Sequence, residues 1–196
     1  MGLSTEPQDQ AAEEARSASD AALLAAVGKR DARALESLVA RHGDWAFGFV
    51  FRLSGNRQLA EEVVQSAFLR LWQRADAWEG RSRFSTWFYR VLHNLAIDRM
   101  RRLGPAAEAL DEALPDPADG PEQATMREQR DARVRAALAA LPERQRAAIV
   151  LSHYEGRSQT EASAILGISE GALESLLSRA RASLRIMLAA ERRLEE

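Results

Sequence analysis

A stretch rich in proline and acidic residues divides this chain and limits the folds open to it. The segment LGPAAEALDEALPDPADGPEQ, residues 103–123, holds four of the six prolines and few large apolar side chains. From Gly104 to Gln123 it has six acidic residues and no basic one. Since proline interrupts helices and the segment has little apolar surface to bury, we predict a flexible acidic linker over residues 104–125. The chain is then expected to fold as two units.

The remainder of the chain has the composition of helices. Alanine, leucine and arginine dominate and β-branched residues are sparse, which favours helical structure. Start and stop signals predict helices near 20–28, 31–55, 57–77 and 86–103, and helical periodicity resumes at Val134. We therefore expect an all-α protein with a disordered tail over 1–18, a small helical domain over 19–103, the linker, and a second helical domain over 126–192.

Composition excludes several classes of protein. There is no cysteine, which rules out disulfides, thiolate zinc sites and cysteine nucleophiles. The three histidines are too scattered to suggest a metal site, and no glycine-rich phosphate loop or nucleophile–base pair is present, so we expect neither an enzyme nor a cofactor. No apolar run approaches the roughly 20 residues that span a bilayer. The N-terminus is polar and acidic rather than a secretory signal, which favours a cytoplasmic protein without a membrane segment.

The formal net charge of −2 hides a segregation of charge along the chain. Every basic residue except Lys29 is an arginine, and one short segment holds six of them: Arg81, Arg83, Arg90, Arg99, Arg101 and Arg102. A block of like charges indicates a local surface property that the net charge of the whole chain does not reveal. A surface for an acidic partner and a merely solvated helix face are both open interpretations.

Residues 158–185 have the pattern of a helix-turn-helix. Ser158 and Glu161 form a capping box, Gly167 suits a turn that needs a positive φ, and Ser169 can cap the next helix. In that motif the second helix enters the major groove with its N-terminal turns leading. A plain helical hairpin is the alternative. The positions expected to meet DNA are Glu170, Ala172, Glu174, Ser175, Ser178, Arg179 and Arg181.

The N-terminal domain has two further candidate surfaces. In the helix near 57–77, Leu69 points away from the apolar stripe and lies near Glu62 and Gln65, either as an anchor for a partner helix or as an exposed leucine of no function. In the helix near 86–103, arginines interleave with an aromatic ring and an asparagine, which suits unstacked single-stranded bases; a core tryptophan beside a solvated face is the alternative. The residues predicted on this outward face are Trp87, Arg90, Asn94, Ile97, Asp98 and Arg101.

Two long stretches resemble a known family. LAEEVVQSAFLRLWQ followed by FSTWFYRVLHNLAIDRMRR resembles region 2 of extracytoplasmic-function (ECF, group IV) RNA polymerase sigma factors. LPERQRAAIVLSHYEGRSQTEASAILGISEGALESLLSRARASLR is similar to their region 4. The resemblance spans about Ala21 to Leu188 and implies an alternative sigma factor that directs core RNA polymerase to promoters.

The resemblance also implies site residues and partners. It places Glu62, Gln65 and Leu69 against the clamp helices of the polymerase β′ subunit, with the β flap as a further partner. It assigns the −35 element to the helix after Ser169, and the linker to the path toward the RNA exit channel. An anti-sigma factor is the implied regulator. The residues that it assigns to melting and reading the −10 element are Trp78, Arg81, Arg83, Trp87, Arg90, Asn94 and Arg101.

Departures from the family pattern and two rival functions remain. Ser66 stands where an acid is common, and Ala162 and Ser163 replace a larger residue followed by alanine. Glu174 and Leu176 stand where some relatives carry arginine, so the −35 sequence cannot be transferred from those relatives. One rival is a decoy that only binds an anti-sigma factor, which should have lost its DNA-binding arginines or gained a receiver domain. The other is a helix-turn-helix repressor, which should dimerise and bind duplex DNA without polymerase.

Overall fold

The computed structural model describes residues 19–75, 83–103 and 132–194, and all the regular elements within these ranges are helices. The all-α prediction is confirmed. The expected tail over 1–18 and linker over 104–125 lie outside the described residues. In chain order the elements are a helix over 19–28, α2 (Ala32–Ser54), α3 (Arg57–Gln73), α4 (Phe84–Leu103), a helix over 132–139, α6 (Glu143–Ile149), the π-helical turn η2 (Val150–Tyr154), α7 (Gln159–Leu166) and α8 (Glu170–Leu194).

Local signals set most helix ends in the N-terminal half. The side chain of Asp31 accepts hydrogen bonds from the first backbone N–H groups of α2, and Gly55 ends that helix at φ 67°. The end of α3 differs from the prediction, because the helix stops at Gln73 rather than at residue 77. The guanidinium of Arg30 donates to the carbonyl of Trp72 at 2.6 Å and so satisfies one of the last carbonyls of the helix. This contact joins residues far apart in sequence.

The helix-turn-helix forms as its caps predict. The hydroxyl of Ser158 accepts from the backbone N–H of Glu161, whose carboxylate accepts in turn from the N–H of Ser158, so the capping box is complete. Gly167 ends α7 at φ 66°, and the hydroxyl of Ser169 accepts from the N–H of Ala172 at the start of α8. The motif therefore has its predicted geometry within residues 158–194.

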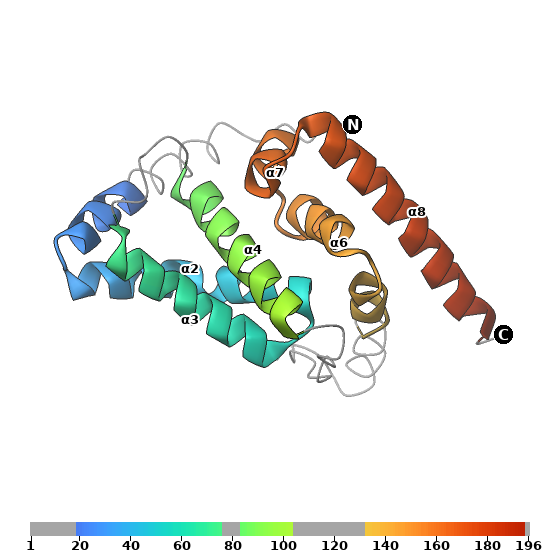
Figure 1. The fold of residues 1–196 in the computed structure, drawn as a ribbon, viewed down its shortest axis with the longest axis horizontal. Coiled ribbons are helices and arrows are strands. Elements are labelled where there is room, and N and C mark those ends of the chain that lie inside the picture. Colours follow the sequence, from blue (N-terminus) through green and yellow to red (C-terminus); the bar gives the residue numbers. More distant parts are fainter. Residues whose placement is uncertain (1–18, 76–82, 104–131, 195–196) are drawn as a thin grey trace, which may run out of the picture.

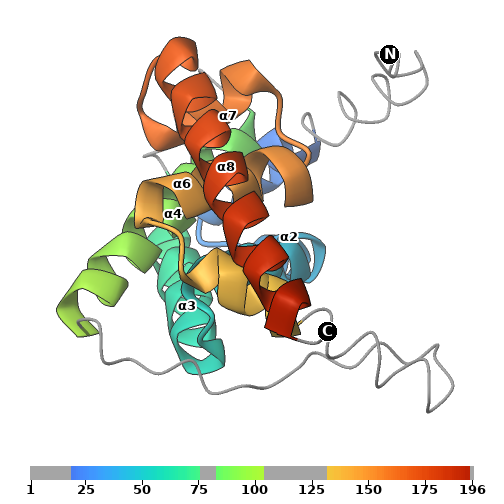
Figure 2. The same cartoon turned by 90° about the vertical axis from the view of Figure 1, so that its right-hand side faces the viewer.

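The helices form two groups that pack against each other (Figure 1). Helix α4 lies between α2 and α3 on one side and α6 and α7 on the other. Helix α8 is outermost and packs on α6 and α7, as the turned view also shows (Figure 2). One buried cluster contains residues of both groups, such as Phe49 and Leu92 from the first and Leu151, Ile165 and Leu173 from the second. The sequence predicted two units and left their relative placement open; the structure joins them through a shared apolar core.

Replacing Gly167 by alanine should destabilise the C-terminal group. A Cβ there meets nothing within 4 Å, so the cost comes from the positive φ of 66° and not from a clash. A left-handed conformation costs an L-residue about 1–2 kcal/mol. Thermal unfolding followed by circular dichroism should show a Tm lower by about 2–4 °C for each kcal/mol. Gly171→Ala is the control, because Gly171 is helical and equally unobstructed, and its Tm should hold or rise. Equal melting of Gly167→Ala and the native chain would contradict this account.

Candidate nucleic-acid interface

The recognition helix α8 presents an open surface. Its predicted groove positions are exposed without exception: Glu170, Ala172, Glu174, Ser175, Ser178, Arg179 and Arg181. Leu173 and Ala180 face inward and are fully buried. The carboxylate of Glu170 accepts from the hydroxyl of Thr160 on α7 at 2.7 Å, which orients the leading turn. An exposed helix with carboxylate, hydroxyl and guanidinium groups at its N-terminal end can read base edges and contact phosphates.

The corresponding face of α4 is largely exposed, at Arg90, Asn94, Asp98 and Arg101, and the second helical group contacts two of these residues. The guanidinium of Arg90 donates to the carbonyl of Ala164 at the end of α7 at 2.7 Å. Arg101 pairs with Glu143 of α6 at 3.2 Å. Asn94 is exposed and lines a cavity of about 230 Å³ together with Arg101 and Glu143. The predicted residues therefore share a face, and the second helical group contacts that face at Arg90 and Arg101.

Two residues of the predicted outward face of α4, Ile97 and Trp87, are more buried than the prediction implied. Ile97 is only 6% exposed, and it lines the same cavity as Leu166, Ile168 and Leu176 of the helix-turn-helix. The periodicity of one helix could not show that a second apolar surface covers it. Trp87 is half-buried, and its ring stacks on Phe88 and lies 5.9 Å from the ring of Phe84. Trp87 is thus partly a core residue and presents at most an edge to a ligand.

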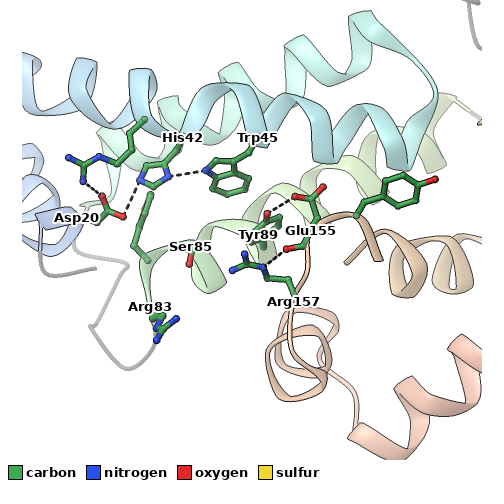
Figure 3. Close-up of a pocket in the computed structure, with 11 residues that line it drawn as sticks. Asp20, His42, Trp45, Arg83, Ser85, Tyr89, Glu155 and Arg157 are labelled. Atoms are coloured by element: carbon green, nitrogen blue, oxygen red, sulfur yellow. Dashed lines mark hydrogen bonds and ion pairs between the residues drawn. The ribbon is translucent and has the colours of Figure 1, made fainter. Parts of the chain in front are cut away.

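The loop before α4 is only partly described. Trp78 and Arg81 lie outside the described residues. Arg83 is exposed at the start of α4, and its carbonyl accepts from the N–H of Trp87 at 3.2 Å. Arg83 also lines the cavity of about 470 Å³ drawn in Figure 3.

A buried carboxylate lies at the junction of the two helical groups (Figure 3). The side chain of Glu155, just after η2, is 7% exposed. One of its oxygens pairs with Arg52 of α2 at 2.7 Å, and the other accepts from the hydroxyl of Tyr89 of α4 at 2.7 Å. The guanidinium of Arg157 lies over the ring of Tyr89 at 5.4 Å from its centre. One side chain thus bonds to two helices of the other group.

Burial shifts the pKa values of three groups at this junction. Burial, and next the charge of Glu155, raise the pKa of Tyr89 well above its ordinary value of 10.0. Burial likewise lowers the pKa of His93, which lies on α4 near Glu143 and Arg144. Burial also lowers the pKa of Arg146; its guanidinium donates to the carbonyl of Leu53 at the end of α2 at 2.6 Å.

Another polar network holds the first helix on α2. Nε2 of His42 lies 3.1 Å from the carboxylate of Asp20, and Nδ1 accepts from the indole N–H of Trp45 at 3.0 Å. The guanidinium of Arg41 binds the same carboxylate at 2.5 Å. Figure 3 shows these groups along one wall of the cavity that also contains Tyr89 and Glu155. The network orients the N-terminal end of the domain and is a structural feature.

The predicted polymerase surface on α3 is exposed and borders a groove. Glu62 and Gln65 line a hollow between α2 and α3 with a partly apolar floor that includes Phe47 and Val64. Leu69 lies one helical turn beyond Gln65 and is 54% exposed, as predicted. The carboxylate of Glu62 pairs with Arg99 of α4 at 3.0 Å. Such a surface can accept an apolar or basic helix.

The sequence reasoning missed the residues at the junction. Arg52, Tyr89, Arg146 and Glu155 carry no local signal, because each acts on a segment distant in sequence. Within the described ranges no group of three or more metal-ligating side chains occurs. Nor does any described helix have the length and apolar character needed to cross a membrane.

Comparison with known proteins establishes the family. Residues 38–105 match the family model Sigma-70 region 2, and residues 131–184 match Sigma-70, region 4. The chain is 35% identical over 161 residues to the ECF RNA polymerase sigma factor SigE of Mycolicibacterium smegmatis, covering 79% of this chain and 61% of SigE. It is 31% identical over 173 residues to SigW of Bacillus subtilis, covering 83% and 92%. The chain belongs to the ECF sigma factors.

A solved structure supports the same conclusion. The chain is 33% identical to the RNA polymerase sigma factor CnrH of Cupriavidus metallidurans. A structure of CnrH has been solved in complex with the cytosolic domain of CnrY. That structure superposes with a TM-score of 0.67, covers 88% of this chain and 98% of CnrH, and is 30% identical. Sigma factors are non-catalytic initiation factors, so core RNA polymerase and promoter DNA are the partners that family membership implies.

The raised pKa of Tyr89 predicts a pH dependence. Because the folded-state pKa lies above the unfolded value, the neutral phenol stabilises the fold below about pH 10, and this contribution is lost as pH rises further. Tyrosinate absorbance should therefore follow the same curve in the native chain and in Tyr89→Phe until unfolding begins. A native chain that shows an extra tyrosinate near pH 10, with its helical circular dichroism intact, would contradict the assignment.

Proposed function

We propose that this chain carries core RNA polymerase to specific promoters and opens them, with residues 19–103 serving as region 2 and residues 126–192 as region 4. Helix α8 reads the −35 element, and the outward face of α4 with the preceding loop holds the −10 element. The linker over 104–125 threads toward the RNA exit channel, where its acidity suits a basic path. The protein acts in the cytoplasm, where polymerase and chromosome are.

The observation that carries this proposal is the exposed helix-turn-helix. Seven predicted groove positions of α8 are exposed, and the hydroxyl of Ser169 caps the start of that helix. The arginines Arg179 and Arg181 can neutralise phosphates. A decoy should have lost such arginines, and both remain. A repressor of this kind is a second candidate only if the isolated chain dimerises.

The polymerase surface is proposed to be the α3 face with Glu62, Gln65 and Leu69, bound by the β′ clamp helices. The groove between α2 and α3 adds Phe47 and Val64 to that surface. The β flap is the proposed partner of region 4. An anti-sigma factor is the proposed regulator, and the solved complex of the relative CnrH with CnrY supports it.

Transcription by reconstituted polymerase tests the function as a whole. Core polymerase with this chain, on sheared DNA of the source genome, should produce transcripts with defined 5′ ends that share upstream sequence elements. Core polymerase alone should not. The same products in both reactions, together with tight duplex binding by the chain alone, would favour the repressor.

Leu69→Arg should weaken binding to core polymerase. An anchor at the centre of an interface contributes about 2 kcal/mol or more, or roughly thirtyfold in Kd. The control is Leu103→Arg at the end of α4, since Leu103 has the same exposed fraction of 54%. Fluorescence anisotropy with labelled protein measures both. Equal affinity of the two variants, with unchanged Tm, would remove Leu69 from the interface.

Glu174→Ala and Arg181→Ala should act on promoter binding in different ways. If Glu174 accepts from a base, its loss relaxes discrimination at one −35 base pair by about 1–3 kcal/mol. The loss of Arg181 instead weakens all sequences alike and reduces the slope of affinity against salt by about one unit. Binding of holoenzyme to a set of single-base −35 variants separates the two. A uniform effect of Glu174→Ala would mean that the carboxylate reads no base.

A further inference from the structure

A cavity of about 290 Å³ lies between the C-terminal end of α2, the helix over 132–139, α6 and η2. We call it the α2 cavity. Among the described residues it shares only Tyr154 with the cavity drawn in Figure 3, and its lining includes none of the residues predicted to bind DNA or polymerase. Its volume is close to the lower end of the range for small-molecule sites, about 300–1,000 Å³. The proposed function leaves this cavity without a role.

The α2 cavity has an apolar wall. Phe51 of α2 and Leu138 of the helix over 132–139 are buried, and Val134 of the same helix is half-buried. Tyr154 is 46% exposed, and the guanidinium of Arg52 lies 5.5 Å from the centre of its ring. Apolar surface of this kind is stabilised when a ligand removes it from water. The wall therefore favours a ligand with an apolar body.

The charged side chains that line the α2 cavity, within the described ranges, are all arginines: Arg52, Arg135 and Arg146. Arg52 is paired with Glu155. Arg146 donates to backbone carbonyls, such as that of Leu53, and its buried Nε has no hydrogen-bond partner among the described residues. Burial lowers the pKa of Arg146, because its cation is poorly solvated. This excess of positive charge favours an anionic head group.

We propose that the α2 cavity binds a small amphipathic carboxylate, with its apolar body on Phe51, Leu138 and Tyr154 and its head group toward the arginines. Guanidinium groups bind carboxylates through paired, charge-assisted hydrogen bonds. A single negative charge suits the site, because Glu155 already pairs with Arg52 and most of the other lining is apolar. A cavity of this volume holds one small molecule, whereas a helix of a partner protein needs a long open groove. Neither DNA nor polymerase is needed for this binding.

Isothermal titration calorimetry of the full chain tests the ligand class. The probes are octanoate, decanoate and dodecanoate, each below its critical micelle concentration. At least one of them should bind saturably, with one site per chain. Acetate has the head group without the apolar body, and decyltrimethylammonium has the apolar body with the opposite charge. Both should bind more weakly by about tenfold or more, because each lacks one of the two kinds of contact.

Variants on the helix over 132–139 test the position of the site. Arg135→Gln should weaken carboxylate binding by about tenfold, since it removes one charged donor. Arg133→Gln is its control, because Arg133 is exposed on the same helix and does not line the cavity. Ala139 is exposed and lines the cavity, so Ala139→Trp should fill the space and abolish binding. Ala136→Trp, exposed on the same helix and outside the cavity, should retain it.

Selective carboxylate binding that is weakened in Arg135→Gln and lost in Ala139→Trp, with both controls unaffected, supports the proposal. Equal binding of decanoate and decyltrimethylammonium would show a surfactant effect and overturn it. The absence of saturable binding for all three carboxylates would overturn it as well, and so would binding that survives in Ala139→Trp with helical circular dichroism intact. Transcription by the reconstituted polymerase judges the proposed function separately.

Discussion

The side chain of Glu155 joins the two helical groups of this protein, and much of the arrangement around α4 depends on it. Its carboxylate is largely removed from water and bonds at 2.7 Å to both Arg52 and Tyr89. A carboxylate in such surroundings is stable only when its partners are in place. Burial, and next the charge of Glu155, raise the pKa of Tyr89, and α7 packs on α4.

This junction connects the fold with regulation. An ECF sigma factor must bind polymerase, a −35 duplex and a −10 single strand, and these tasks fall on α3, α8 and α4 under the proposed assignment. The surfaces on α3 and α8 are exposed in this structure. Arg90 and Arg101 on α4 are exposed as well, and each also binds an acceptor of the C-terminal helices. A partner that binds both regions could hold this arrangement or release it.

Local chemistry accounts for the parts of the site that the sequence predicted well. Capping by Asp31, Asn56 and Ser158, and the positive φ of Gly55 and Gly167, depend on neighbours a few residues away. The exposure of Leu69 and of the groove positions of α8 follows from helical periodicity. Helical periodicity did not predict the early end of α3, where Arg30 binds a terminal carbonyl. Nor did it predict the burial of Ile97 or the stacking of Trp87, because these depend on the helix-turn-helix and on neighbouring aromatic rings.

The sequence by itself determined the helical class, the caps, the helix-turn-helix and the family, since all of these are written in short-range patterns or in stretches of contiguous residues. Only the tertiary structure decided that the two helical groups share a core, that Glu155 and Arg146 bind across the junction, and that Ile97 is buried beside the helix-turn-helix. These features depend on partners about 66 to 103 positions apart. No periodicity within a single helix specifies which distant surface will cover it.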